Sequence, residues 1–184
     1  MEVFWERGYE GASVAELTEA IGIAAPSLYA AFGSKQNLFR EAVALYDSRE
    51  GSLTERALRS GPTARSSIEA MLRDNARMYA DPETPSGCLV VLGATTWTPG
   101  NKAVRDYLAG LRRQTFEVGR ARLERGVADG DVRADADISA IAAYYRTVLE
   151  GLSIQARDGA TLETMNAIID CAMAGWDRLA APRE

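Results

Sequence analysis

The sequence predicts an all-α protein in which a short three-helix unit precedes a larger helical domain. Apolar residues recur at intervals of three and four along the 184-residue chain, as they do on one face of a helix. No stretch alternates apolar and polar residues in the manner of a strand. The first helical segments are short and the later ones long, so we place the domain boundary near residue 47, with domains at 1–47 and 48–184.

Composition and charge exclude several classes of protein. Hydrophobic residues make up 47% of the chain and charged residues 26%, which is typical of a globular protein and not of a disordered one. The formal net charge of −5 excludes a surface that is basic throughout, although it permits a local basic site. Histidine is absent, which removes Ser-His-Asp and Cys-His catalysis and imidazole-based metal sites. We therefore expect no metal and no cofactor.

The cysteines and the apolar stretches bear on the compartment in which the protein acts. Cys88 and Cys171 are far apart and form no Cys-x-x-Cys pair, so two reduced, buried thiols are favoured and one disulfide is the alternative. The amino terminus lacks the regions of a signal peptide, and the longest apolar stretch, 88–94, is far shorter than the ~20 residues of a membrane span. We expect a cytoplasmic protein with no membrane partner.

Two short helices are predicted near the amino terminus. Ser13 and Glu16 have the spacing of a capping box, which begins the first of these helices, and Gly22 ends it. Pro26 fits the start of the second helix, and Gly33 ends it. Helices this short need a further helix beneath them for stability. The order of helix, tight turn and helix is the helix-turn-helix layout, in which the second helix enters the major groove of DNA.

The same segment resembles the DNA-binding domain of the TetR/AcrR family of one-component transcriptional regulators. The resemblance covers about residues 1–47, and its motifs lie at 8–17, 20–23, 27–29, Phe32 and 34–38. It implies a homodimer that binds a pseudo-palindromic, double-stranded operator DNA, usually as a repressor. It also implies a larger domain that dimerises and binds an unknown small-molecule ligand, which weakens DNA binding. The remainder of the chain resembles the family in being all-helical with two long terminal helices.

The second short helix supplies most of the residues expected to contact DNA. Leu28 and Phe32 face inward, so their neighbours face outward. Hydroxyl groups can bond to base edges or phosphates, alanines can offer a methyl group to thymine, and a lysine at a helix start can bind phosphate. The expected contacts are Ser13, Ala24, Ala25, Ser27, Tyr29, Ala30 and Lys35. The alternatives are that Ser13 is only a cap, Tyr29 only packs, and Lys35 is only a solvated charge.

Two features predict weaker phosphate binding than the family commonly shows. Ala30 and Ala31 stand where the family commonly has an aromatic residue or histidine that contacts phosphate. Residues 1–50 carry four basic and eight acidic side chains, a net charge of −4. One alternative is therefore a DNA-binding-defective helical dimer that acts only as a ligand- or protein-binding module. Another expectation is that a basic segment precedes Met1, because the family's first helix begins earlier and often carries Arg and Lys.

Bulky side chains in the larger domain suggest a pocket for an apolar or aromatic ligand. Three polar residues, Arg77, Arg112 and Gln114, are candidates to orient a polar group of the ligand, with solvent exposure as the favoured alternative. Packing in the core is the alternative for the bulky residues. Those expected to line the pocket are Met71, Met78, Tyr79, Leu92, Trp97, Tyr107, Phe116 and Tyr144.

The last two predicted helices, at about 136–157 and 162–179, are expected to form the dimer interface. Each carries more apolar surface than one core needs, which favours an intermolecular four-helix bundle, with packing inside one chain as the alternative. The expected interface residues are Ile138, Ile141, Tyr145, Val148 and Leu152 on one helix and Met165, Ile169, Ala172 and Trp176 on the other. Because the chain has no Glu-x-x-His pair and no nucleophile motif, we expect no enzyme activity.

Overall fold

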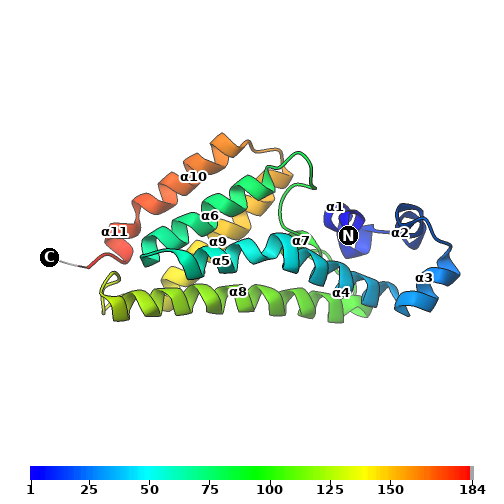
Figure 1. Ribbon diagram of the computed structural model, residues 1–184, viewed down its shortest axis with the longest axis horizontal. Coiled ribbons are helices and arrows are strands. Elements are labelled where there is room, and N and C mark those ends of the chain that lie inside the picture. The colour runs from blue at the N-terminus through cyan, green and yellow to red at the C-terminus, as the bar shows by residue number, and fades with distance from the viewer. Residues whose placement is uncertain (183–184) are drawn as a thin grey trace.

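The computed structural model describes residues 1–182, and these contain helices and no strand, as the sequence predicts. Helices α1 to α3 gather at one end of an elongated molecule, and the carboxyl terminus lies at the other end (Figure 1). The helices are α1 (Glu2–Gly11), α2 (Val14–Ile21), α3 (Ala25–Phe32), α4 (Lys35–Tyr46), the π-helix η1 (Asp47–Gly51), α5 (Ser52–Ser60), α6 (Ala64–Tyr79), α7 (Leu89–Leu92), the 3₁₀ turn η2 (Pro99–Asn101), α8 (Lys102–Asp129), α9 (Ile138–Arg157), α10 (Leu162–Ala174) and α11 (Trp176–Leu179).

Local capping sets the ends of the short amino-terminal helices, as predicted. The Ser13 hydroxyl accepts a hydrogen bond from the Glu16 amide at 3.2 Å, and the Glu16 carboxylate accepts one from the Ser13 amide at 2.8 Å. Gly22 ends α2 in the left-handed region with φ 76, which a residue with a Cβ rarely adopts. The Ser34 hydroxyl accepts from the Asn37 amide at 3.1 Å and so begins α4.

Helices α1, α3 and α4 all contribute side chains to the core of the amino-terminal domain. Leu28 of α3 is completely buried, and it packs with aromatic residues from α1 and α4. The Phe4 ring meets the Phe39 ring edge-on at 5.0 Å between centroids, and Tyr9 does the same at 5.2 Å. The two short helices are therefore held by α1 and α4, which supply the support that helices of this length need.

A π-helix joins the two parts of the molecule. Helix α4 continues through η1 into α5, and the three run on along one line in Figure 1. A Cβ at Gly51 would overlap the Asp47 carboxylate, which folds back over it. On sequence alone, Gly51 either breaks this helix or only weakens it, because glycine disfavours a helix interior. In the structure the helix continues through a single π-helical turn. Such turns are rare, and those that occur are frequently at functional sites.

Two predicted helices differ from those observed. The nearly all-apolar run at 88–97 predicts one short helix of that length, and this prediction is wrong, since α7 is a single turn that ends before Gly93. The Gly93 carbonyl instead accepts a hydrogen bond from the Tyr9 amide in α1, at 2.7 Å. The last predicted helix, at 162–179, is interrupted at Gly175 and becomes α10 and α11. The long helix α8 ends at Gly130, which has φ 81, where the Asp-Gly pair predicted a helix end.

Helices α5 to α11 pack around one elongated core, with α9 in contact with α6, α8 and α10. No helix among residues 1–182 has the length and apolar character that would let it cross a lipid bilayer.

Candidate DNA interface and ligand pocket

The outer face of α3 presents small and hydroxyl-bearing side chains to solvent. Ser27 and Ala30 are exposed, and the Tyr29 side chain is 47% exposed. Ala24 is exposed just before the helix, and Ala25 is half-buried at its first turn. Because Leu28 anchors the opposite face in the core, this surface is held outward by packing. The exposure of Tyr29 weighs against its being only a packing residue.

The three basic side chains nearest this face interact within the chain. The Lys35 ammonium lies 4.4 Å from the centre of the Tyr9 ring. Burial lowers the pKa of Lys35, and Glu10 and Glu16 act in the opposite direction. Arg7 is paired with Glu16, and the Arg40 guanidinium lies 5.3 Å from the centre of the Tyr107 ring.

Ser13 acts as a cap whose hydroxyl is occupied as a donor. Its Oγ donates to the Glu16 carboxylate at 2.7 Å while accepting from the Glu16 amide. Hydrogen bonds from the Ser13 amide and hydroxyl, together with the charge of Arg7, lower the pKa of Glu16. A phosphate at this helix start would compete with the Glu16 carboxylate for the same donors.

Helix α1 is fixed to the larger domain by hydrogen bonds to its backbone. Arg157, the last residue of α9, donates to the Trp5 carbonyl at 2.8 Å, to the Ser86 carbonyl at 2.9 Å and to the Glu6 carbonyl. The Trp5 indole N–H donates to the Gly87 carbonyl at 2.8 Å. One guanidinium therefore ties α1 and the loop before α7 to the end of α9.

The other end of α1 is held by the segment after α7. Besides the bond between the Tyr9 amide and the Gly93 carbonyl, the Glu10 carboxylate accepts from the Thr98 amide and the Asn101 side chain, each at 2.9 Å. These bonds, that from Asn101 foremost, lower the pKa of Glu10. We call the groups that hold α1 the α1 seat, which comprises Ser86, Gly87, Gly93, Thr98, Asn101 and Arg157.

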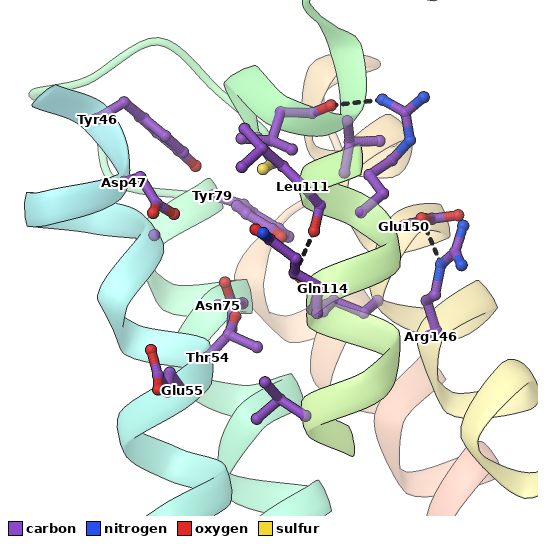
Figure 2. A pocket seen from close by; sticks show the side chains of 18 residues that line it. Tyr46, Asp47, Thr54, Glu55, Asn75, Tyr79, Leu111, Gln114, Arg146 and Glu150 are labelled. Atoms are coloured by element: carbon purple, nitrogen blue, oxygen red, sulfur yellow. Dashed lines mark hydrogen bonds and ion pairs between the residues drawn. The ribbon is translucent and has the colours of Figure 1, made fainter. Parts of the chain in front are cut away.

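A cavity of about 140 Å³ lies among α5, α6, α8 and α9, and Tyr46 and Asp47, at the junction of α4 and η1, form one side of it (Figure 2). Its apolar wall is formed by Val90, Val91, Leu111, Val118 and Leu149. Its polar and charged lining comprises Tyr46, Asp47, Thr54, Glu55, Asn75, Tyr79, Cys88, Arg112, Gln114, Thr115, Arg146 and Glu150. The lining therefore combines an apolar wall with many polar and charged side chains, and it can contact both the apolar and the polar part of a small molecule.

Most polar side chains of the cavity interact with one another or with the backbone. The Asn75 amide donates to the Thr54 hydroxyl at 2.9 Å, and Arg146 donates to Glu150 at 2.8 Å. Arg112 donates to the Val90 carbonyl at 2.7 Å. These groups line the cavity with their hydrogen bonds already made.

Three buried groups at the upper end of the cavity have raised pKa values. Burial raises the pKa of the Tyr46 and Tyr79 hydroxyls well above their usual value, and it raises the pKa of the Cys88 thiol. The carboxyl of Asp47 also has a raised pKa, first because of desolvation and second because of Glu55. The Tyr46 and Tyr79 hydroxyls and the Cys88 thiol are therefore neutral at pH 7.

Of the residues that the sequence suggested for the ligand, Tyr79, Arg112 and Gln114 line this cavity. The other seven bulky residues do not. Met71 and Met78 are buried elsewhere along α6, and Tyr144 is 42% exposed. Cations cover the rings of the aromatic residues Trp97, Tyr107 and Phe116, and Leu92 is half-buried in α7. The size of a side chain did not identify the cavity lining. Asn75, an asparagine on an otherwise apolar helix face, is the feature of the sequence that would have indicated it.

Most residues expected at the dimer interface are buried within the single chain. Seven of them have exposed fractions of 4% or less, and the other two, Ile138 and Val148, are half-buried. The seven are Ile141, Tyr145, Leu152, Met165, Ile169, Ala172 and Trp176. Their regular spacing reflects packing of α9 onto α6 and α8 and of α10 onto α6 and α9. The opposite face, which includes Tyr144, Thr147 and Ile154 of α9 and Ala167 and Cys171 of α10, is exposed.

The cysteines are not bonded to one another, and they differ in burial. Cys88 lies in the cavity wall, half-buried by surface exposure, whereas Cys171 is exposed on α10 and so departs from the expected buried thiol. Within residues 1–182, no cluster of three or more acidic or cysteine side chains has a geometry that could hold a metal ion.

Comparison with known proteins identifies the family. The family model described as bacterial regulatory proteins of the tetR family matches residues 1–42, and that of the tetracyclin repressor-like C-terminal domain matches residues 62–170. The chain belongs to the TetR family. TetR-family proteins are transcriptional regulators and not enzymes, so the predicted family, all-α fold and lack of an enzymatic function are confirmed.

Individual relatives agree over nearly the whole chain. The HTH-type transcriptional repressor ComR of Escherichia coli is 31% identical, over 97% of this chain and 86% of that protein. The repressor BdcR of the same organism is also 31% identical, over 94% of this chain and 82% of that protein. A solved structure of the TetR-family regulator CifR, a cysteine mutant bound to 26-bp operator DNA, superimposes with a TM-score of 0.93 and 48% identity, covering 95% of this chain and 92% of that one.

Proposed function

We propose that this TetR-family regulator is a cytoplasmic repressor that binds a specific pseudo-palindromic operator as a homodimer and is released by a small ligand. The outer face of α3 carries this proposal. It is exposed along a helix whose other face is anchored by Leu28, in a domain that matches the family over residues 1–42. CifR, which is 48% identical over 95% of this chain, binds operator DNA in its solved structure.

Direct base contacts come from α3 in this proposal, and phosphate contacts from the helix starts around it. Ser27 and Tyr29 offer hydroxyl groups, while Ala24, Ala25 and Ala30 allow the backbone to approach thymine methyl groups closely. Lys35 binds phosphate after leaving the Tyr9 ring, and Ser13 after releasing Glu16. The small number of available cations predicts operator binding with a shallow dependence on salt.

The dimer forms through the exposed faces of α9 and α10 in this proposal. Tyr144, Thr147 and Ile154 are spaced so that they share one face of α9, and small residues of α10 lie exposed beside them. In such a dimer, the two copies of α3 must lie about 34–36 Å apart to enter successive major grooves, because that is one helical turn of DNA. We assign residues 1–47 to DNA binding and 48–184 to ligand binding and dimerisation.

Ligand release follows from the position of the cavity. Helix α4 begins at Lys35, shortly after α3, and ends at Tyr46 in the cavity wall, so it spans both sites. A ligand shifts the orientation of the two α3 helices only by as much as its affinity differs between the two arrangements.

Selection of bound DNA from a random duplex library, at low and near-physiological salt, tests this function. We expect enrichment of a two-fold-symmetric site, which Tyr29→Ala and Lys35→Ala weaken. The control Arg125→Ala, which removes an exposed cation paired with Asp129 at the far end of α8, should leave enrichment unchanged. A folded dimer that enriches no site at either salt would contradict the proposal. It would favour the alternative of a ligand- or protein-binding module without DNA binding, which the acidic amino-terminal domain supports.

A further inference from the structure

The Tyr46 hydroxyl is a buried hydrogen-bond donor without a partner. Tyr46 is 1% exposed, and its hydroxyl has no hydrogen-bond partner of good geometry within residues 1–182. The Leu89 amide lies near the hydroxyl oxygen, but an amide N–H only donates, so the hydroxyl proton has no oxygen or nitrogen of these residues to receive it. Its close polar neighbour is the Cys88 thiol, a weak partner. Buried hydroxyls in folded proteins are nearly always paired, because an unpaired one loses the hydrogen bonds that water would have made. An orphaned hydroxyl in the wall of a cavity therefore marks the position of a missing acceptor.

The position of this hydroxyl links the orphaned donor to the cavity. Tyr46 belongs to the cavity lining, and Figure 2 shows its side chain running from α4 toward the space in which Tyr79 and Leu111 lie. Of the buried side-chain atoms without a partner in the described chain, the Tyr46 hydroxyl is the one that belongs to this lining. Five other polar side chains of the lining already have partners, namely Thr54, Asn75, Arg112, Arg146 and Glu150.

Size and charge restrict what the cavity can hold. Its volume of about 140 Å³ is close to that of cavities of ~150 Å³ that accept benzene. Asp47 and Glu55 at one side oppose an anionic ligand, and the guanidinium groups of Arg112 and Arg146 at the other oppose a cationic one. The desolvation of a charged ligand in an apolar-walled cavity adds to both effects.

We propose that the cavity binds a compact, neutral, ring-sized organic molecule whose oxygen accepts a hydrogen bond from the Tyr46 hydroxyl. The apolar part of the molecule lies against Val90, Leu111 and Leu149. The assignment deepens the ligand-release function proposed above, and its regulatory meaning rests on that function.

The same tyrosine ring connects the ligand to the DNA-binding domain. It meets the Trp5 indole edge-on, with 4.8 Å between ring centroids, and the Trp5 N–H is bonded to Gly87 of the α1 seat. A ligand that bonds to the Tyr46 hydroxyl and shifts the ring therefore also changes the contact between that ring and Trp5 of α1.

Calorimetric titration with three matched probes tests the assignment. Acetophenone has a ring and one carbonyl acceptor, ethylbenzene has a similar shape and no acceptor, and benzoate carries a negative charge. We expect acetophenone to bind the wild-type dimer about threefold to tenfold more tightly than ethylbenzene, the range given by one net hydrogen bond. Benzoate should bind more weakly than either.

Two tyrosine variants show whether Tyr46 is the donor. Tyr46→Phe should reduce acetophenone affinity to the level of ethylbenzene and leave ethylbenzene binding unchanged. The control Tyr145→Phe removes a buried hydroxyl that bonds to the Ala172 carbonyl and lies outside the cavity lining, so it should change neither affinity.

The outcomes separate this inference from the function on which it builds. Equal binding of acetophenone and ethylbenzene, unchanged acetophenone binding in Tyr46→Phe, tighter binding of benzoate, or no binding of any probe would each overturn the inference. All are measured without DNA, so none depends on operator binding. Failure of the proposed function would appear instead as loss of site enrichment in the duplex library.

Discussion

The α1 seat and the outer face of α3 belong to the same small domain, but they use their polar groups in opposite ways. In the seat, backbone carbonyls and amides of α1 are bonded to Arg157, Gly93 and the neighbouring loop. On α3, the polar side chains point to solvent. The chain thus completes its own hydrogen bonds where the domain must be held, and leaves them open where DNA must bind. The Tyr46 hydroxyl belongs to the second kind, because its partner also comes from outside the chain.

The largest effect is expected from closing the space at Gly87 in the α1 seat. Gly87 has φ 80, and a Cβ there would lie 2.6 Å from the Ser153 carbonyl oxygen. Gly87→Ala should lower the free energy of unfolding by roughly 3 kcal/mol or more, through backbone strain and overlap. Gly159 has φ 90 and open space around it, so Gly159→Ala should cost about 1–2 kcal/mol. Urea unfolding of both variants measures the difference, and equal losses would mean that the seat is not closely packed.

The next largest effect is expected from Arg157. Its guanidinium bonds three carbonyls of α1 and the adjoining loop, so Arg157→Ala should lower the unfolding free energy by about 2–3 kcal/mol and alter Trp5 fluorescence. Arg125→Ala, which breaks an exposed pair with Asp129, should cost less than about 0.5 kcal/mol. An Arg157 variant as stable as the Arg125 variant would show that α1 does not depend on these bonds.

The sequence predicts the parts of this comparison that depend on neighbours along the chain. The capping box at Ser13 and the cap at Ser34 each join residues three apart, and both are as predicted. The α1 seat joins Trp5 to a carbonyl 82 residues away and to a guanidinium 152 residues away. No local pattern encodes such contacts, so the sequence does not predict the α1 seat. For the same reason, the apolar run at 88–97 predicts a helix that is longer than α7.

Spacing identified apolar faces without showing what covers them. Tyr145 and Ile169 recur with helical period, as interface residues would, but neighbouring helices of the same chain bury them. The large side chains of Trp97 and Phe116 likewise suggested that they line the pocket. The cavity is lined instead by residues such as Tyr46 and Asn75, whose polar groups are buried. Only the three-dimensional arrangement distinguishes a ring in the core from a ring beside a cavity.

A smaller effect is expected from two buried tyrosines that differ in pairing. Tyr145→Phe leaves the Ala172 carbonyl without its partner and should lower the unfolding free energy by about 1 kcal/mol. Tyr46→Phe removes a hydroxyl that has no partner, so stability should stay unchanged or rise slightly. Thermal unfolding of the ligand-free proteins distinguishes the two. A clear loss in Tyr46→Phe would show that the hydroxyl is bonded within the chain.

The smallest effect is expected from acidification of the seat. The pKa of Glu10 is lowered in the folded protein, so its contribution to stability is complete above the pKa of the unfolded chain and is lost as pH falls through the folded value. Stability of the wild type should therefore fall more steeply than that of Glu10→Gln between about pH 5 and pH 3. Urea unfolding at each pH measures both curves, and parallel curves would show that the bonds from the α1 seat to the Glu10 carboxylate do not stabilise the fold.

The central claim is that a ligand bound to Tyr46 loosens the hold on DNA through α1 and α4. Fluorescence anisotropy of the selected operator, titrated with protein in the presence and absence of saturating acetophenone, tests it directly. We predict that acetophenone weakens operator binding by the wild type and Tyr145→Phe at least about fivefold, the lower end of allosteric coupling, and has less effect on Tyr46→Phe. Operator affinity that stays the same in the wild type while acetophenone occupies the cavity would contradict the account.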